Sequence, residues 1–170
     1  MQKTALCLLG TGRSIEYTFE NLKEFLINDL TNCDVIVYLT KNDKSDLARK
    51  YFETLSNAKI YVVEEAPLNT SEYAFMADWP SRPNSSHQIY LQMIKSRSYM
   101  NELIELQNKD YDRVIFSRMD VIYQKRVAPL IKDLDLSNIW IPNFHNWLGG
   151  YNDRFAVSSK QNMFDYFSIY

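Results

Sequence analysis

The sequence predicts an α/β fold with a mostly parallel sheet and helices on both of its faces. Short runs of apolar residues, typical of strands buried on both sides, alternate with segments whose apolar residues recur at helical spacing. Up to Val63 these segments follow one another as strand, helix, strand, helix and strand. Because strands joined by helices pair in parallel with right-handed crossovers, this order predicts a parallel sheet.

Composition excludes several classes of protein. The 170 residues, 46% apolar and 24% charged, have the balance of one ordinary soluble domain rather than of a disordered chain. Nineteen basic and twenty-one acidic residues leave no basic excess, so we expect no nucleic-acid partner. No apolar run is long enough for a signal peptide or a membrane span, which predicts a cytoplasmic protein without an integral membrane segment.

Cys7 and Cys33 lack metal-binding spacing and are expected to be reduced thiols.

The first predicted strand, residues 3–9, ends in a glycine turn of sequence Gly10-Thr11-Gly12-Arg13. Ser14 is the expected N-cap of the helix that follows. The free N–H groups of a helix N-terminus, together with Arg13, suit a phosphate. The alternative is a tight turn that requires glycine only for its backbone. A dinucleotide-binding fingerprint is disfavoured because Ile15 stands where its third glycine would be.

Residues 34–40 and 59–63 are the second and third predicted strands, and a helix capped by Asp43 or Ser45 runs between them to about Leu55. Thr40 ends the second strand and is expected beside the glycine turn, because parallel neighbours end at the same edge of a sheet. Residues 64–85, which hold three of the five prolines, interrupt the pattern. A loop of that length is either a mobile cover over a binding crevice or an ordered surface loop.

The longest predicted helix runs from residue 85 or 86 to about 108, and Gln88, Gln92 and Lys95 share one of its faces. The helix leads directly into the next strand, so its N-terminal half should lie at the carboxyl end of the sheet. There Gln92 and Lys95 would contact a bound phosphate. A solvated polar face is the alternative.

Residues 112–118 are the strand around which the predicted site is organised. Its apolar run leads into the triplet Arg118-Met119-Asp120. In open α/β sheets the ligand lies outside the carboxyl ends of the strands, so a cation and a carboxylate delivered there can hold a metal-bound phosphate. The alternative is that Arg118 and Asp120 only pair with each other or with neighbouring loops.

The last part of the chain predicts three further elements. These are a short helix over residues 127–134, a strand over residues 138–142, and a final helix that a capping box at Ser158 and Gln161 opens.

Three segments, Leu9–Arg13, Tyr111–Asp120 and Gly149–Ala156, together carry a resemblance to a known family. In their order and spacing the sequence resembles the nucleotide-sugar glycosyltransferases of the GT-A fold, and particularly a group of small bacterial and viral members. The resemblance implies a GT-A-like (Rossmann-like) single domain over residues 1–170, which is either a minimal catalytic domain or part of a longer chain.

The resemblance also implies a divalent metal. In the family an Asp-x-Asp element holds a metal ion that bridges the donor's diphosphate, and the matching triplet here is Arg118-Met119-Asp120. Asp120 is therefore the expected ligand of Mn²⁺ or Mg²⁺, since Mg²⁺ takes one or two carboxylates plus substrate phosphates. Arg118 would itself supply part of the positive charge that the diphosphate needs. His145 is a further candidate ligand.

An acidic residue after the later strands of the family touches the donor sugar or acts as general base on the acceptor hydroxyl. The match is Asp153, with Asn152 as a neighbouring substrate contact, and the preceding pair Gly149-Gly150 would let the backbone approach a sugar. A carboxylate within hydrogen-bond distance can take the proton of a hydroxyl. The alternative is an Asn-Asp turn.

We therefore expect a glycosyltransferase that moves a sugar from a UDP- or GDP-linked donor to a hydroxyl of a carbohydrate or other acceptor, with divalent-metal assistance. One alternative is a nucleotidyltransferase, which would be expected to have a richer glycine and basic loop. The other is a non-catalytic nucleotide- or carbohydrate-binding module of the same fold, which the single carboxylate at Asp120 favours. The expected catalytic residue is Asp153 and the expected metal ligand is Asp120; the expected substrate-binding residues are Gly10, Thr11, Gly12, Arg13, Thr40, Gln92, Lys95, Arg118 and Asn152.

Overall fold

The structure is a computed structural model of the chain and describes residues 2–66, 68, 85–144 and 152–168. Most of the predicted cover at residues 64–85, and His145, lie outside these residues. The elements in order are β1 (Thr4–Gly10), α1 (Ile15–Leu22), the π-helical turn η1 (Lys23–Ile27), β2 (Cys33–Thr40), α2 (Ser45–Phe52), β3 (Ala58–Val63), α3 (Ser85–Glu105), β4 (Arg113–Arg118), α4 (Ala128–Ile131), β5 (Phe155–Ser158) and α5 (Lys160–Phe167).

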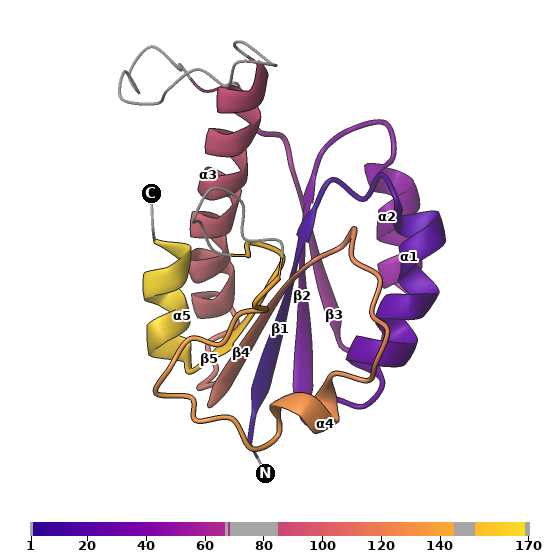
Figure 1. Cartoon of the computed structure of the whole chain (residues 1–170). Coiled ribbons are helices and arrows are strands. Elements are labelled where there is room, and N and C mark those ends of the chain that lie inside the picture. The colour runs from indigo at the N-terminus through magenta and orange to yellow at the C-terminus, as the bar shows by residue number, and fades with distance from the viewer. Residues whose placement is uncertain (1, 67, 69–84, 145–151, 169–170) are drawn as a thin grey trace.

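The described strands form a single sheet in the order β3-β2-β1-β4-β5 (Figure 1). The pairs β1–β2, β2–β3 and β1–β4 are parallel, whereas β5 runs antiparallel to β4 at the edge. The predicted mostly parallel α/β sheet is therefore confirmed. Since β1, β2 and β4 run in the same direction, their carboxyl ends lie side by side at one end of the sheet, which is uppermost in Figure 1.

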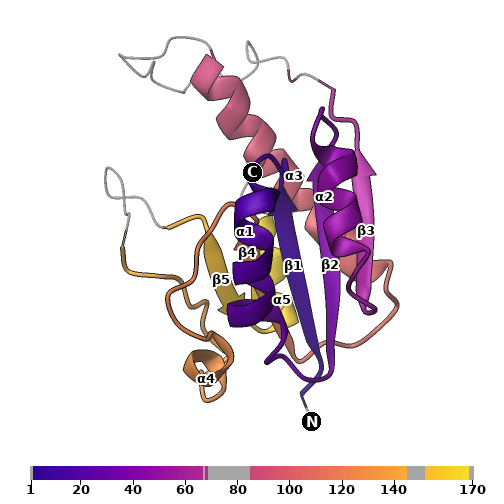
Figure 2. The same cartoon turned by 90° about the vertical axis from the view of Figure 1, so that its right-hand side faces the viewer.

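Each face of the sheet is covered by its own group of helices. Leu6 and Leu8 of β1 point to the face covered by α1, η1, α2 and α4. Cys7 points to the opposite face, which α3 and α5 cover. Figure 2 shows α1 and α2 in front of the strands, with α3 behind them. Because β1 is buried from both sides, its residues 5–9 are apolar at every position rather than at alternate ones.

The two cysteines are free thiols, as predicted. Burial raises the pKa of Cys33 to about 12, and burial likewise raises the pKa of Cys7 far above its usual value. Both side chains therefore pack as small neutral groups. Within the described part of the chain no helix is both long and apolar enough to cross a membrane.

Several helix boundaries differ from the prediction. The helix after Ser14 continues through η1, and α2 ends at Phe52 instead of about Leu55. The long helix α3 ends at Glu105, and Asn108, where we expected the end, has a φ of 48°. A left-handed residue of this kind terminates a helix, and asparagine tolerates that conformation better than most residues do.

Two predictions about the C-terminal part are wrong. Residues 138–142 do not form a strand, because within them only Trp140 makes a bridge, an isolated one to Val157 of β5. The N-cap of the last helix is Ser159 rather than Ser158, since Oγ of Ser159 accepts a hydrogen bond of 3.3 Å from the backbone N–H of Asn162. Ser158 is instead the buried last residue of β5, and its hydroxyl donates to the carbonyl oxygen of Asn138.

We expect Ser159→Ala to lower the free energy of unfolding by about 1 kcal/mol, because the substitution removes the oxygen that caps α5. Chemical denaturation measures the difference. Ser56→Ala, at an exposed position between α2 and β3, is the control and should change stability by less than about 0.5 kcal/mol. Equal effects of the two substitutions would contradict the assignment of the cap.

Candidate functional site

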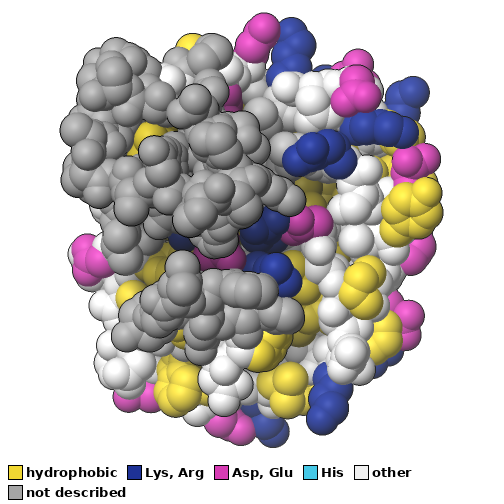
Figure 3. Space-filling model, turned by 45° about the horizontal axis from the view of Figure 1, so that its top comes forward, with side chains coloured by type: hydrophobic (Ala, Val, Ile, Leu, Met, Phe, Trp, Pro, Cys, Tyr) yellow, Lys and Arg dark blue, Asp and Glu magenta, His cyan; other side chains and the backbone are white. Residues whose placement is uncertain are grey.

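A cavity of about 620 Å³ opens at the carboxyl ends of β1, β2 and β4 and is closed on one side by α3. The glycine turn after β1 and the residues that follow β4 form its floor. Figure 3 looks onto this end of the molecule, where basic and acidic side chains gather at the centre of the face. The position is the one in which open α/β sheets bind their ligands.

The glycine turn has a fixed backbone conformation. Gly12 has a φ of 69°, and a Cβ atom there would lie 2.5 Å from Cβ of Ala48. Asn42, in the loop after β2, donates from Nδ2 to the carbonyl oxygens of Thr11 (2.7 Å) and Thr40 (2.8 Å). Two neighbouring loops are thereby tied together, and α1 begins at Ile15 directly behind them. The requirement for glycine at position 12 is therefore conformational and steric at once.

Arg118 and Asp120 form a two-point ion pair after β4. Nε and Nη2 of Arg118 donate to Oδ1 and Oδ2 of Asp120 at 2.8 and 2.5 Å. Burial acts to raise the pKa of Asp120, but the hydrogen bonds and charge of Arg118 outweigh it and hold the pKa below its usual value. Hydrogen bonds to Asp120 likewise raise the pKa of Arg118. Both side chains are charged at neutral pH. They pair with each other, and their role in binding a ligand stays a prediction.

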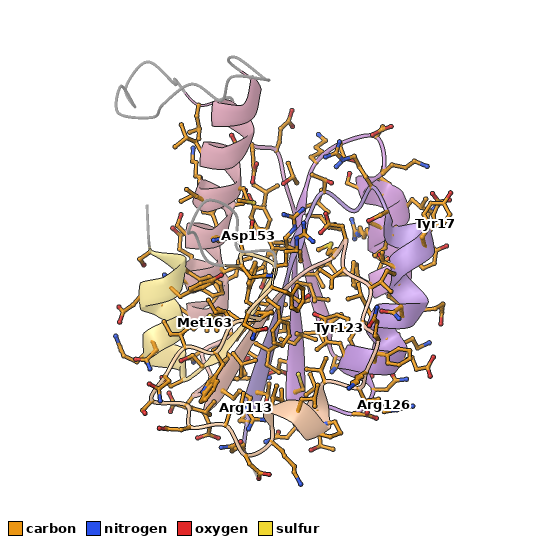
Figure 4. The ribbon with its side chains drawn as sticks, in the orientation of Figure 1. Tyr17, Arg113, Tyr123, Arg126, Asp153 and Met163 are labelled. Atoms are coloured by element: carbon orange, nitrogen blue, oxygen red, sulfur yellow. The ribbon has the colours of Figure 1, made fainter. Side chains whose placement is uncertain are left out.

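Asp153 connects this pair to helix α3. Its Oδ2 lies 3.6 Å from Nη1 of Arg118 and 3.3 Å from Nη2 of Arg97, and its carbonyl oxygen accepts a hydrogen bond of 3.1 Å from Arg97. Figure 4 shows Asp153 near the upper end of the sheet, on the side of α3. Negative and positive side chains thus alternate in one continuous row, in the order Asp120, Arg118, Asp153 and Arg97.

Arg97 is the most enclosed cation of the site, with a side chain that is only 13% exposed. Its Cζ lies 5.6 Å from the ring centroid of Phe116 and 5.7 Å from that of Tyr166. The Nε of Arg97 is buried and has no hydrogen-bond partner among the described residues. Two aromatic rings and one carboxylate therefore hold this guanidinium beside the cavity.

Glu65 follows β3 and contributes a carboxylate to the lining of the cavity. One of its oxygens, Oε1, accepts hydrogen bonds from the hydroxyls of Tyr38 and Ser96. The other, Oε2, is buried without a partner among the described residues. Burial, followed by the hydrogen bond to Glu65, raises the pKa of Tyr38, so this phenol stays protonated and donates.

The structure brings most of the predicted site residues together. The predicted residues that line the cavity are Gly10, Thr11, Gly12, Arg13, Thr40, Gln92, Arg118 and Asp120. Asp153 lies next to this lining, behind Arg118 and Arg97. What these residues bind stays a prediction.

Two predicted contacts lie outside the cavity lining. The α3 residues that line the cavity include Gln92, Ser96 and Arg97, and Lys95 points to a neighbouring face because successive residues turn by 100°. Asn152 is buried and serves its own loop, since it donates to the carbonyl oxygen of Phe144 and accepts from the N–H of Arg154.

Sequence reasoning missed Arg97, Ser96 and Glu65. A signal for Arg97 existed, because it lies four residues after Met93 and three before Met100, within the apolar stripe of α3. A charged residue in such a stripe is buried and needs partners. No local pattern marked Ser96 or Glu65.

The described residues do not form a ready-made site for a divalent metal. They contain no group of three or more His, Cys, Asp or Glu side chains placed to share an ion. Both oxygens of Asp120, the predicted ligand, accept hydrogen bonds from Arg118. A hard cation with oxygen ligands would have to displace that guanidinium first.

Comparisons with known proteins agree with this architecture. A family model described as "Domain of unknown function (DUF7796)" matches residues 1–164. No curated protein matches the sequence. The galactosyltransferase LgtC, solved with donor and acceptor sugar analogs, is similar over 95% of this chain and 59% of its own, at 15% identity and a TM-score of 0.54.

Two further solved structures are similar. The glycosyltransferase GlyE of Streptococcus pneumoniae TIGR4 is similar over 98% of this chain and 36% of its own, at 10% identity and a TM-score of 0.51. The mannosyltransferase PcManGT of Pyrobaculum calidifontis, solved with GDP-Man and Mn²⁺, is similar over 98% and 46%, at 14% identity and a TM-score of 0.48. This chain spans about three fifths of LgtC and about a third of GlyE. The likeness to LgtC and GlyE establishes the predicted GT-A-like fold.

We expect Gly12→Ala to destabilise the protein by about 2 kcal/mol or more, because it places a Cβ at positive φ and against Ala48. Gly10→Ala is the matched control, since a Cβ there would lie 3.5 Å from Cβ of Met119, an ordinary contact. It should change stability by less than about 1 kcal/mol. Urea denaturation compares the two variants, and an equal loss in both would show that the turn does not require glycine at position 12.

Proposed function

We propose that this chain, which belongs to the DUF7796 family, is a glycosyltransferase that binds a nucleoside diphosphate sugar and transfers the sugar to an acceptor hydroxyl. The observation that carries the proposal is the convergence of a glycine turn and three arginines, Arg13, Arg97 and Arg118, on one cavity of about 620 Å³. A cavity of this size accommodates a nucleotide-sized ligand. The fold, which resembles that of LgtC, supports the same class of reaction.

The diphosphate is the part of the donor that the cavity suits best. The turn from Gly10 to Arg13 lines the cavity, and the N-terminus of α1 at Ile15 follows it directly. Arg118 adds a guanidinium, whose planar donors match phosphate oxygens. Arg118 would leave Asp120 to contact a phosphate in this way, and the predicted Mn²⁺ or Mg²⁺ would likewise need this ion pair to open. No step of the transfer is derived through a metal ion.

Asp153 is our candidate for the general base that takes the proton of the acceptor hydroxyl. It is the carboxylate nearest to Arg118 on the loop that precedes β5. The same contacts also suit it to position Arg97 and Arg118, because its Oδ2 lies within 3.6 Å of both guanidinium groups. The two roles differ in what they predict for donor affinity.

A non-catalytic nucleotide-binding module is the second candidate. The observation that favours it is the engagement of both Asp120 oxygens by Arg118, since this carboxylate is then withdrawn from chemistry. Binding of a nucleotide sugar without turnover, with or without an acceptor, would establish the module instead of the enzyme.

We expect one class of UDP-, GDP-, CMP- or ADP-linked sugar to raise the midpoint of thermal unfolding by about 5 to 10 °C at a hundredfold excess over its Kd. Differential scanning fluorimetry with and without Mn²⁺ measures this shift. Release of nucleoside diphosphate, with sugar acceptors or with water, then tests turnover. Absence of a shift with every donor would refute the proposed function, and release of pyrophosphate from nucleoside triphosphates would favour a nucleotidyltransferase.

Asp153→Asn should lower the turnover of sugar transfer by about 100-fold or more, because the amide cannot accept the hydroxyl proton. We also expect a smaller loss of donor affinity, since the charge that orients the two arginines is lost as well. Calorimetry of donor and of bare diphosphate, beside the turnover number, separates the two contributions. Full turnover with only a modest loss of stability would reduce Asp153 to a structural residue of its loop.

A further inference from the structure

Arg118 stands where the resemblance to metal-dependent glycosyltransferases would place a first metal-binding carboxylate. Its guanidinium occupies both oxygens of the remaining carboxylate, Asp120, at 2.8 and 2.5 Å. The pair is half-buried, and a metal ion that bound Asp120 would displace the guanidinium of Arg118 from both carboxylate oxygens. This displacement is costly, because the guanidinium would lose both of its acceptors. A guanidinium that is paired with a carboxylate is therefore built into the protein at this end of β4.

A second fixed cation lies beside the first. Arg97 and Arg118 come from α3 and β4 but share the single oxygen Oδ2 of Asp153, at 3.3 and 3.6 Å. Two guanidinium groups that share one acceptor atom keep N–H donors without acceptors, and their positive charges repel each other. A bound anion with several oxygens would accept from the unused N–H donors and reduce the repulsion.

Arg97 has little freedom to move away from this position. The rings of Phe116 and Tyr166 lie 5.6 and 5.7 Å from its Cζ, and its side chain is 13% exposed. Its buried Nε has no partner within the described part of the chain. Because the surroundings are poor in water, the charge acts on a nearby anion with less screening than at an open surface.

We propose that Arg118 and Arg97 together take the place of a divalent cation, so that this cavity binds the diphosphate of its ligand without metal. This inference rests on the proposed function, whose donor carries the diphosphate. The two guanidinium groups donate hydrogen bonds to the phosphate oxygens of the ligand, and Arg118 exchanges its contacts with Asp120 for contacts with phosphate.

The same pair then serves the transfer step. The bond between the anomeric carbon and the phosphate oxygen breaks, and its electron pair leaves with the nucleoside diphosphate. A bond forms between the anomeric carbon and the acceptor oxygen, whose proton passes to the general base. The guanidinium groups stabilise the negative charge that develops on the leaving diphosphate.

The test measures binding of UDP, GDP and ADP by calorimetry, in EDTA and in Mn²⁺. We expect the nucleotide that binds to have affinities within about threefold of each other in the two conditions. Arg118→Gln should weaken its binding in EDTA by about 10- to 100-fold, because hydrogen bonds to a charged group are lost. Arg118→Lys should recover only part of this loss, since a lysine lacks the second donor.

The matched control is Arg126→Gln. Arg126 pairs with Asp29 on the exposed surface and lies far from Asp153 in Figure 4, so its removal should leave nucleotide affinity unchanged. Arg97→Lys is the corresponding variant of the enclosed cation and should weaken binding as well. Thermal unfolding without ligand checks that each variant is folded, and Arg118→Gln alone decides the matter if Arg97→Lys does not fold.

Asp120→Asn gives results of opposite sign under the two hypotheses. If the arginines replace the metal, the substitution frees Arg118, and nucleotide affinity in EDTA should equal or exceed that of the parent. If Asp120 holds Mn²⁺, the substitution should abolish a metal-dependent affinity.

Binding that EDTA abolishes and Mn²⁺ restores would overturn the inference and leave the proposed function standing. If no nucleoside diphosphate binds in either condition, the proposed function falls together with the inference.

Discussion

The parallel pairing of β1 with both β2 and β4 is the constraint on which the candidate site depends. In this register Gly10 lies beside Leu39 of β2, and Leu9 lies beside Arg118 of β4. The loops that leave these three strands therefore start at neighbouring points of one edge. Parallel strands also require crossover helices, and helices that cover the two faces leave the edge itself open. The cavity is a consequence of that arrangement.

The chain of charges from Asp120 through Arg118 and Asp153 to Arg97 gives this edge its chemical character. It joins the end of β4, the loop before β5 and the middle of α3, which are far apart in the sequence. Each member restrains the next, so Arg97 and Asp153 are oriented before a ligand arrives, whereas Arg118 has to leave Asp120 to contact the proposed ligand. Such preorganisation reduces the ordering that binding would otherwise require. Asn42 and Asn152 support the same edge from behind, because each holds loop backbone in place.

The fold was predictable from the sequence to a large extent, because the central strands β1, β2 and β4 each contain a continuous run of apolar residues. The strands β1, β2, β3 and β4 were all located to within a residue or two. The outer side of the sheet, next to the edge strand β5, was less predictable. Residues 138–142 contain apolar residues as dense as those of a strand, yet only Trp140 bridges to Val157 while β5 occupies the place beside β4. Trp140 pairs with β5 and not with β4, and whether such a segment extends one bridge into a strand depends on tertiary packing, which is not visible within the segment.

By itself, the sequence determined the α/β class, the glycine turn after β1 and the presence of Arg118 and Asp120 at the end of β4. These features depend on the period of apolar residues and on the order of strands and helices, which are local properties of a chain. Only the tertiary structure decided that Arg97 faces the cavity and Lys95 does not, and that Asp153 lies between two arginines. The reason is physical: the rotation of α3 about its axis and the path of the loop before β5 are set by packing against the sheet. Residues distant in sequence impose that packing together, so no single segment contains the information.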